Sequence, residues 1–274
     1  EDRGYQFADG VYEVIPVIRG RQVDGVGHLE RLARSLRELR IEPPMSDRAL
    51  DMVIDETIRR NRVRDGYVYI QVTRGVAPRN HPFPDPAVPA ALVVYANPKQ
   101  GLGVDVAHTP GVRVITVPDQ RWARRDIKTV GLLPNCLAKQ AAVEAGAREA
   151  FQVDAEGFVT EGSSTNAWIV DGDGNLVTRP ASNEILNGIT RLAIMKLAGE
   201  QGLNVVERPF SVEELKSARE VFLSSASSFA TPVTQVDDRV IGNGEPGSVT
   251  SRLMEIFAGY VARGEMNAAA GMTR

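Results

Sequence analysis

The sequence predicts an α+β protein with two unequal domains. Short strand-like segments alternate with amphipathic helices along the 274 residues, and tight turns at residues 154–157 and 171–174 join neighbouring strands in antiparallel pairs. Turn-forming residues at 97–103 separate two such regions, as expected for a chain above ~250 residues. Antiparallel pairing favours α+β over a doubly wound parallel sheet.

The N-terminal region begins with a strand over residues 11–18, which is rich in Val and Ile and ends at a glycine turn. Leu29, Leu32, Leu36 and Leu39 then recur every three or four residues and predict an amphipathic helix. Ser46 can cap a second helix, and strands at 67–73 and 91–95 follow. The proline-rich stretch 74–89 between these strands predicts a long, functional loop.

The C-terminal region repeats the mixture of strands and helices. We expect strands at 112–117, 149–153, 166–170 and 220–224, and helices at about 132–146, 190–202 and 247–263. The domains predicted are a small α+β domain over residues 1–97, a linker at 98–104, and a larger domain over 105–274. Because the chain begins in mid-motif at Glu1, we expect the small domain to lack its first strands.

Composition excludes several classes of protein. The charge is 32 minus 35, or −3, and no basic run occurs, so we expect neither a nucleic acid nor a membrane as partner. Cys136 is the only cysteine, which excludes an intrachain disulfide and a cysteine-based zinc site. We therefore expect no metal, and a cytoplasmic location. No apolar stretch reaches the ~20 residues that span a bilayer.

Two segments carry the chemistry. Lys128 lies in Trp-Ala-Arg-Arg-Asp-Ile-Lys-Thr, and Glu161 lies in a predicted loop, Val-Thr-Glu-Gly-Ser-Ser-Thr-Asn, over residues 159–166. A lysine amine can form a Schiff base with pyridoxal 5'-phosphate (PLP), and a carboxylate can hold the proton on its pyridine nitrogen. Taken singly, each residue also fits a simpler interpretation, as a surface lysine or as part of a capped turn.

A PLP enzyme must also hold a phosphate dianion. Gly188, Ile189 and Thr190 open a predicted helix, whose first backbone N–H groups can bind an anion. The serine-rich stretch 224–228 adds hydroxyls and turn amides, and Arg31 can add a fixed cation. Each also fits a structural role alone: a helix cap, a surface loop or a solvated helix residue.

The chain resembles the fold-type IV PLP-dependent aminotransferases, and among them the bacterial D-amino-acid transaminases. The resemblance runs almost end to end. It is carried by seven ordered motifs, at residues 2–7, 9–14, 71–75, 126–128, 137–140, 160–164 and 188–191. It implies a small α/β domain and a larger, mixed β-barrel-like domain that carries most of the PLP site.

The resemblance also implies residue roles. Lys128 becomes the Schiff-base lysine and proton shuttle, Glu161 the partner of the pyridine nitrogen, and Leu186 the residue packed against the cofactor ring. The implied phosphate site comprises Arg31, Gly188, Ile189, Thr190, Ser225 and Ala226. Ala226 departs from the threonine that is usual in the family, which puts the affinity for PLP in doubt.

The subfamily assignment depends on Arg79 and His81. A guanidinium binds a carboxylate through two parallel hydrogen bonds, and an imidazole can add a third donor. In D-amino-acid transaminases an Arg-x-His in this loop forms such a carboxylate trap with the tyrosine that matches Tyr12, and the loop reaches in from the neighbouring subunit. Tyr69 is expected to line the same pocket. The resemblance thus implies a homodimer with its active site at the subunit interface.

The function expected is ping-pong transamination between a D-amino acid and a 2-oxo acid. The same fold also admits a branched-chain L-aminotransferase, an (R)-amine transaminase and an aminodeoxychorismate lyase, over which Arg79 and His81 favour the D-amino-acid interpretation. A binding protein that kept the scaffold without its activity is a further alternative.

Overall fold

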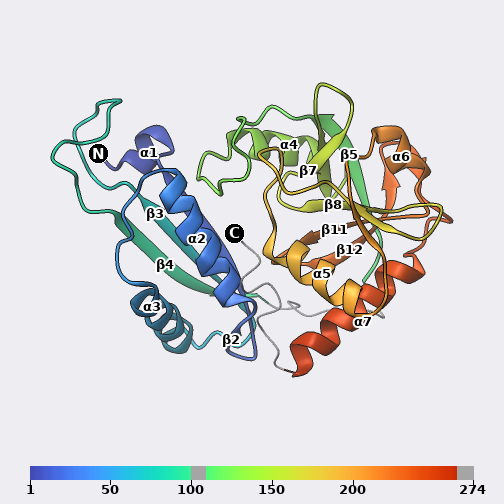
Figure 1. Ribbon diagram of the computed structural model, residues 1–274, viewed down its shortest axis with the longest axis horizontal. Helices are drawn as coiled ribbons and strands as arrows, with labels where there is room; N and C mark the ends of the chain where they lie inside the picture. The colour runs from blue at the N-terminus through green and yellow to red at the C-terminus, as the bar shows by residue number, and fades with distance from the viewer. Residues whose placement is uncertain (100–108, 264–274) are drawn as a thin grey trace. The chain divides into compact units, whose positions relative to one another are not determined.

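The computed structural model of the chain describes residues 1–99 and 109–263, which belong to two compact units (Figure 1). The N-terminal unit contains residues 1–99 together with Ile127–Leu132. The C-terminal unit contains residues 109–126 and 133–263. Of the linker expected at 98–104, positions 100–104 lie outside the described residues.

The N-terminal unit is built on a four-stranded antiparallel sheet in the order β2-β1-β3-β4. Its elements are α1 (Arg3–Phe7), β1 (Gly10–Ile18), β2 (Arg21–Gln22), α2 (Gly25–Glu38), α3 (Asp47–Arg60), β3 (Gly66–Thr73) and β4 (Ala91–Pro98). Figure 1 shows α2 lying along one face of this sheet. Leu32 and Leu36 of α2 pack there against Val11, Ile15 and Ile70, because alternate strand residues point to the same face.

The expected helix cap at Ser46 and the expected strands of this unit are confirmed. The Ser46 hydroxyl accepts a hydrogen bond from the N–H of Ala49 at 3.3 Å and begins α3, as predicted. The strands β1, β3 and β4 contain the segments that the pattern of Val, Ile and Tyr predicted. The five-residue helix α1 was not predicted, because it is too short for a helical period to show.

The C-terminal unit is built on a nine-stranded mixed sheet in the order β10-β9-β8-β11-β12-β5-β6-β7, with β13 paired to β12. Its elements are β5 (Val112–Pro118), α4 (Leu133–Glu144), β6 (Glu149–Val153), β7 (Val159–Gly162), β8 (Asn166–Val170), β9 (Leu176–Thr178), α5 (Ile189–Glu200), β10 (Val205–Glu207), α6 (Val212–Ser217), β11 (Glu220–Ser225), β12 (Phe229–Val236), β13 (Arg239–Val240) and α7 (Ser248–Arg263).

The two faces of this sheet bury separate cores. Trp168 and Phe222 stack at 5.3 Å and pack with Ile194 of α5 and Leu253 of α7. On the other face, Ile169 and its neighbours pack with Phe210 and Leu215. Since antiparallel and parallel pairs occur together with helices, the predicted α+β class is confirmed.

One local prediction is wrong. Residues 159–166 were expected to form a loop, but Val159–Gly162 form strand β7, which pairs with β6. All four residues of β7 are buried, Glu161 included. A buried, charged strand residue breaks the alternating apolar pattern, so the sequence resembles a turn although the chain is extended.

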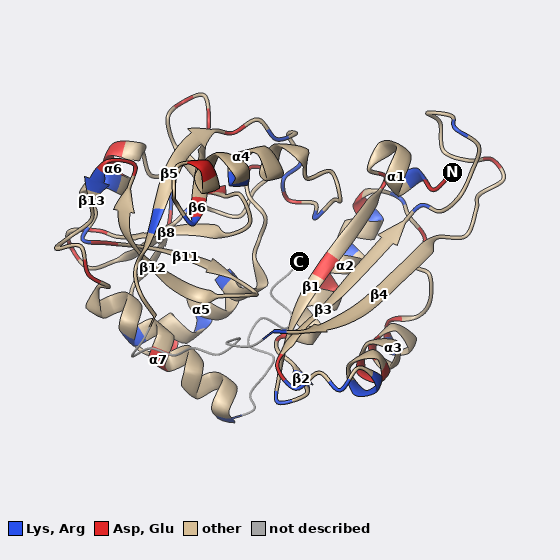
Figure 2. Ribbon diagram, turned by 180° about the vertical axis from the view of Figure 1, so that it is seen from behind, with Lys and Arg blue, Asp and Glu red and all other residues tan. Residues whose placement is uncertain are grey.

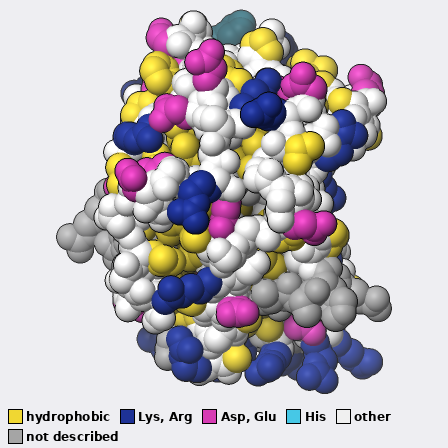
Figure 3. All heavy atoms as spheres, turned by 90° about the vertical axis from the view of Figure 1, so that its right-hand side faces the viewer, with side chains coloured by type: hydrophobic (Ala, Val, Ile, Leu, Met, Phe, Trp, Pro, Cys, Tyr) yellow, Lys and Arg dark blue, Asp and Glu magenta, His cyan; other side chains and the backbone are white. Residues whose placement is uncertain are grey.

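Charged residues are spread over the elements of both units (Figure 2). On the face shown in Figure 3, acidic and basic side chains lie interspersed with apolar ones. Within residues 1–99 and 109–263, no helix has both the length and the apolar composition needed to cross a bilayer.

Candidate active site

Lys128 is held by the backbone of β1. The N–H of Tyr12 donates to the carbonyl of Lys128 at 3.0 Å, and Val130 donates to the carbonyl of Gly10 at 3.1 Å. Thr129 forms an isolated antiparallel bridge with Val11. These bonds fix the segment along the strand, and the Lys128 Nζ lies 4.3 Å from the centroid of the Tyr12 ring. The amine is therefore placed over an aromatic face.

Tyr12 begins a row of three stacked rings on one face of the N-terminal sheet. The Tyr12 and Tyr69 centroids are 5.7 Å apart, and those of Tyr69 and Tyr95 are 4.9 Å apart. Burial, together with the two neighbouring phenols, raises the pKa of Tyr69 to about 12. Tyr69 is thus a neutral phenol at pH 7, and it donates to Gln71 Oε1 at 2.7 Å. The structure brings Tyr12, Tyr69 and Lys128 together.

Arg31 is fixed on the opposite face of the same sheet by a buried carboxylate. Its Nε and Nη2 each donate at 2.8 Å to the two oxygens of Glu13, and His28 Nδ1 lies 2.7 Å from the same carboxylate. Burial opposes the charge on Glu13, but Arg31 and His28 hold its pKa at about 2. Burial also lowers the pKa of His28, so the neutral imidazole donates its Nδ1 proton to the ionised Glu13.

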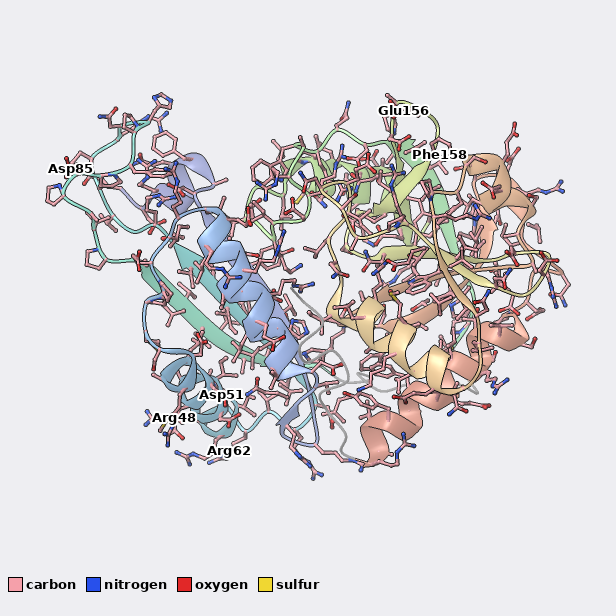
Figure 4. All side chains as sticks on the ribbon, in the orientation of Figure 1. Arg48, Asp51, Arg62, Asp85, Glu156 and Phe158 are labelled. Atoms are coloured by element: carbon pink, nitrogen blue, oxygen red, sulfur yellow. The ribbon has the colours of Figure 1, made fainter. Side chains whose placement is uncertain are left out.

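Arg79 and His81 lie in the loop between β3 and β4, in which Figure 4 labels Asp85. Both side chains are exposed, and both contact Phe7 of α1. The Arg79 guanidinium lies 4.6 Å from the Phe7 ring centroid, and the His81 ring lies 5.4 Å from it. The structure therefore brings this pair together around Phe7, whereas Tyr12 contacts Lys128 and Tyr69.

Glu161 is the buried carboxylate of the C-terminal unit. It accepts hydrogen bonds from Asn166 Nδ2 at 3.0 Å and from the Leu186 N–H at 3.1 Å to each oxygen. Arg121 Nη1 donates to it as well. Burial raises the pKa of Glu161, and the charge of Arg121 opposes that rise. Because burial and the Arg121 charge act on its pKa in opposite directions, the Glu161 carboxyl can share a proton with a nitrogen base placed beside it.

Arg121 was missed by sequence reasoning. Burial disfavours its charge, but Glu161 and Asp119 together raise its pKa above the usual value, so the guanidinium stays charged. Asp119 binds Arg121 Nε at 3.0 Å and Nη2 at 2.7 Å, and it also accepts from the Thr160 hydroxyl at 2.8 Å. Arg121 therefore reaches Glu161 from a fixed position. Because the Arg121–Glu161 pair joins segments forty residues apart, only the fold reveals it.

Asn166, also missed as a site residue, links the other predicted cofactor residues of this unit. Besides Glu161, its Nδ2 donates to the Leu186 carbonyl at 2.9 Å. It pairs with Ser224 across β8 and β11. A Cβ built on Gly188 would lie 2.1 Å from Asn166 Oδ1, so only glycine lets the backbone come this close to the Asn166 side chain. The sequence signal that could have identified Asn166 is its position at the end of the 159–166 motif.

The predicted phosphate-binding groups of this unit are the N-terminus of α5 and the serine-rich turn after β11, and both begin next to Asn166. Gly188 is the N-cap of α5 and makes no side-chain cap hydrogen bond, so the N–H groups of Ile189 and Thr190 open a 12-residue helix. Ser225 Oγ lies 2.8 Å from Ser228 Oγ and 3.3 Å from Ser227 Oγ. Helix N–H groups and clustered hydroxyls suit a phosphate dianion. Ala226 lies in this turn and offers only its backbone.

Comparisons with known proteins identify the family of this chain. The family model for amino-transferase class IV matches residues 10–236. The D-alanine aminotransferase of Staphylococcus haemolyticus is 41% identical over 261 residues, covering 95% of this chain and 91% of its own length. That of Bacillus licheniformis is 41% identical over 253 residues, covering 92% and 88%.

Among solved structures, a branched-chain amino acid aminotransferase from T.th. with pyridoxamine 5'-phosphate superposes with a TM-score of 0.86 at 31% identity, covering 95% of this chain and 87% of its own. The branched-chain enzyme of Escherichia coli gives a TM-score of 0.85 at 28% identity, covering 94% and 86%. The matched length and the sequence identity together establish that this chain belongs to the amino-transferase class IV family.

Proposed function

We propose that this protein is a PLP-dependent transaminase that moves an amino group between a D-amino acid and a 2-oxo acid. The observation that carries the proposal is the buried Glu161, held by Arg121, Asn166 and Leu186 in the unit that also presents the open N-terminus of α5. A carboxylate for a ring nitrogen and an anion site for a phosphate are the two polar anchors that PLP requires. The D-alanine aminotransferases at 41% identity support the choice of substrate.

The residues present fit this cofactor. When bound, PLP supplies an electron sink for the charge left at Cα after a proton is removed. We assign to the Lys128 amine the covalent attachment of the cofactor and the movement of the Cα proton. Glu161 would hold a proton at the pyridine nitrogen of the bound cofactor, and Leu186, whose N–H binds Glu161, would pack against its ring. Solved relatives carry pyridoxamine 5'-phosphate and N-(5'-phosphopyridoxyl)-L-glutamate.

The phosphate is assigned to groups from both ends of the sequence. Gly188, Ile189 and Thr190 offer backbone N–H groups, and Ser225 and Ala226 offer a hydroxyl and turn amides. Arg31 adds a permanent positive charge in a fixed orientation, since Glu13 holds it by charge-assisted hydrogen bonds and His28 donates to the same carboxylate.

Arg79 and His81 are assigned to the substrate carboxylate, with Tyr12 and Tyr69 lining the pocket. Because both loop side chains are exposed in the single chain, we propose that they act in a homodimer whose active site includes the neighbouring subunit's loop. We also propose that a linker over residues 98–104 separates a small domain, residues 1–97, from a larger one, residues 105–274. We propose a cytoplasmic location for the protein.

A branched-chain L-aminotransferase is the second candidate, favoured by the solved structures with TM-scores of 0.86 and 0.85. Their identities of 31% and 28% are below the 41% of the D-alanine enzymes, and Arg79 with His81 favours the D-amino-acid assignment. The test is a panel of paired D and L amino acids with 2-oxoglutarate or pyruvate as acceptor.

This panel, extended by an assay without acceptor, a primary amine and a PLP-binding measurement, separates all the candidates. We expect kcat/KM for D-alanine to exceed that for L-leucine by at least about 100-fold. Polar contacts that fit only one orientation of the substrate carboxylate can produce a ratio of this size. Faster turnover of L-leucine would instead assign the branched-chain activity. Pyruvate release without an acceptor would assign the lyase, turnover of a primary amine without a carboxylate would assign the amine transaminase, and failure to bind PLP would assign a silent binding protein.

A further inference from the structure

Arg3 of α1 is buried in the N-terminal unit, with only 3% of its surface exposed. Its guanidinium donates to Asp9 Oδ2 at 2.9 Å and to three consecutive backbone carbonyls of the β3–β4 loop: Asn80 at 2.6 Å, His81 at 3.2 Å and Pro82 at 3.3 Å. A single side chain therefore ties down the stretch of backbone that carries Arg79 and His81.

Arg3 is itself held from two sides. Its own N–H donates to the Gly75 carbonyl at 2.9 Å, which joins α1 to the end of β3. Asp9 binds Arg3 and also Arg74, whose Nε and Nη2 lie 2.7 and 2.9 Å from the two Asp9 oxygens. Burial opposes the charge on Asp9, but the two guanidinium groups lower its pKa, so the Arg3–Asp9–Arg74 group stays charged at neutral pH.

The same group anchors the far end of the loop segment. The Arg74 guanidinium lies 3.6 Å from the centroid of the Phe83 ring, and that of Arg40 lies 4.8 Å from it. Arg74 also donates to the carbonyls of Leu39 and Arg40 at 2.7 Å, which tie it to the end of α2. Residues 80–83 are thus fixed at both ends while the Arg79 and His81 side chains remain exposed.

Such an arrangement favours binding of a small anion. A free loop loses conformational entropy when a ligand orders it, whereas a loop ordered by the fold loses little and binds the ligand more tightly. Phe7 contributes from the same helix as Arg3, because its ring lies against both Arg79 and His81.

We propose that Arg3 is a positioning residue for the substrate carboxylate: it does not touch substrate, but preorganises the loop that presents Arg79 and His81. The expected effect of Arg3 on KM rests on the proposed function. The expected effect of Arg3 on the order of the loop backbone rests on the loop geometry alone. If Arg3 only held α1 in place, its loss would lower stability without acting through Arg79.

The test compares Arg3→Lys with wild type, with Arg79→Ala and with the double variant, using the full chain loaded with PLP. Arg59→Lys, on an exposed arginine that pairs with Glu56, is the matched control. Lysine keeps the charge but cannot reach Asp9 and three carbonyls at once. KM and kcat are measured for a D-amino acid, and amide hydrogen exchange is followed in residues 77–84.

We expect Arg3→Lys to raise KM about tenfold, to change kcat by less than about threefold, and to accelerate exchange in the loop. In the Arg79→Ala background the same change should raise KM by less than about twofold, because the residue acts through Arg79. An equal rise in both backgrounds, or an unchanged KM with unchanged exchange, overturns the proposal. If Arg3→Lys does not fold, Phe83→Ala, on an exposed side chain, must show the same pattern for the proposal to stand.

Failure of the proposed function has a different signature. In that case wild type itself does not turn over D-amino acids, and the exchange rates of residues 77–84 alone decide whether Arg3 orders the loop. Faster exchange in Arg3→Lys but not in Arg59→Lys supports the anchoring, and equal exchange in the two variants overturns it.

Discussion

The amide of Asn166 donates to Glu161 Oε2 at 3.0 Å and fixes the carboxylate that we assign to the cofactor nitrogen. The same Nδ2 donates to the Leu186 carbonyl at 2.9 Å, while the Leu186 N–H donates back to Glu161. The three residues come from β7, β8 and the segment before α5, and they form a closed set of hydrogen bonds. This set determines where Glu161 points.

Replacing Asn166 by Ala should weaken PLP binding by about 10- to 100-fold, since a hydrogen bond to a charged group contributes about 1.5–3 kcal/mol. The dissociation constant is measured by titrating the apoprotein with PLP and following the cofactor's absorbance. Asn204→Ala, which removes an exposed amide bonded to Asn175, is the control and should bind PLP as wild type does. Equal affinities in the two variants would remove Asn166 from the cofactor site.

Gly188→Ala should also impair PLP binding, for a steric reason. The backbone of Gly188 has φ −64° and ψ 135°, which alanine adopts readily, so any effect comes from the new Cβ lying 2.1 Å from Asn166 Oδ1. We expect Asn166 to be displaced and PLP affinity to fall by at least about tenfold.

Gly199→Ala is the matched control in the same helix. A Cβ there meets no atom within 4 Å, so alanine should stabilise the helix by about 0.5–1 kcal/mol and leave PLP binding unchanged. Calorimetry and PLP titration of the two variants check both expectations. Normal PLP affinity in Gly188→Ala contradicts the assignment of this helix end to the cofactor.

Glu13 should give the protein a specific sensitivity to acid. Its pKa is lowered from 4.5 to about 2 in the folded state, so its contribution to stability is complete above pH ~5 and is lost as the pH falls towards 2. Glu13→Gln leaves Arg31 buried without its counter-charge and should lower the free energy of unfolding by about 3–5 kcal/mol at pH 7.

The difference between wild type and Glu13→Gln should therefore shrink between pH 5 and pH 2. Urea unfolding of both proteins at several pH values measures it. A gap of constant size across this range would show that Glu13 does not titrate in the way its contacts with Arg31 and His28 indicate.

The sequence predicted those parts of the molecule that depend on local patterns. Ser46 caps α3 as expected, and β6 and β8 have the predicted bounds, because turn residues and Val or Ile runs mark them locally. The pattern of β7 predicts a loop because the buried Glu161 interrupts the apolar residues of the strand. A strand can bury Glu161 only because the Arg121 and Asn166 side chains bind its carboxylate, and the sequence alone does not show these contacts.

The supporting residues of the site could not be predicted in the same way. Arg3, Arg121 and Asn166 act through hydrogen bonds to partners that only the folded chain brings near. Arg3 contacts carbonyls 77 to 79 positions away in the sequence, and carbonyls leave no signature in residue type. Motifs therefore pointed to Lys128, Glu161, Arg79 and His81, whereas the groups that orient the last three became visible only in the fold.

The most direct measurement is reduction of the protein with borohydride in the presence of PLP, followed by mass analysis of its peptides. We predict one pyridoxyl-phosphate adduct, on the peptide that contains Lys128, and its loss in Lys128→Ala, which should still fold but lose nearly all turnover. A chain that remains unlabelled at Lys128, or a Lys128→Ala variant with wild-type rates, would show that Lys128 is not the residue that binds PLP covalently.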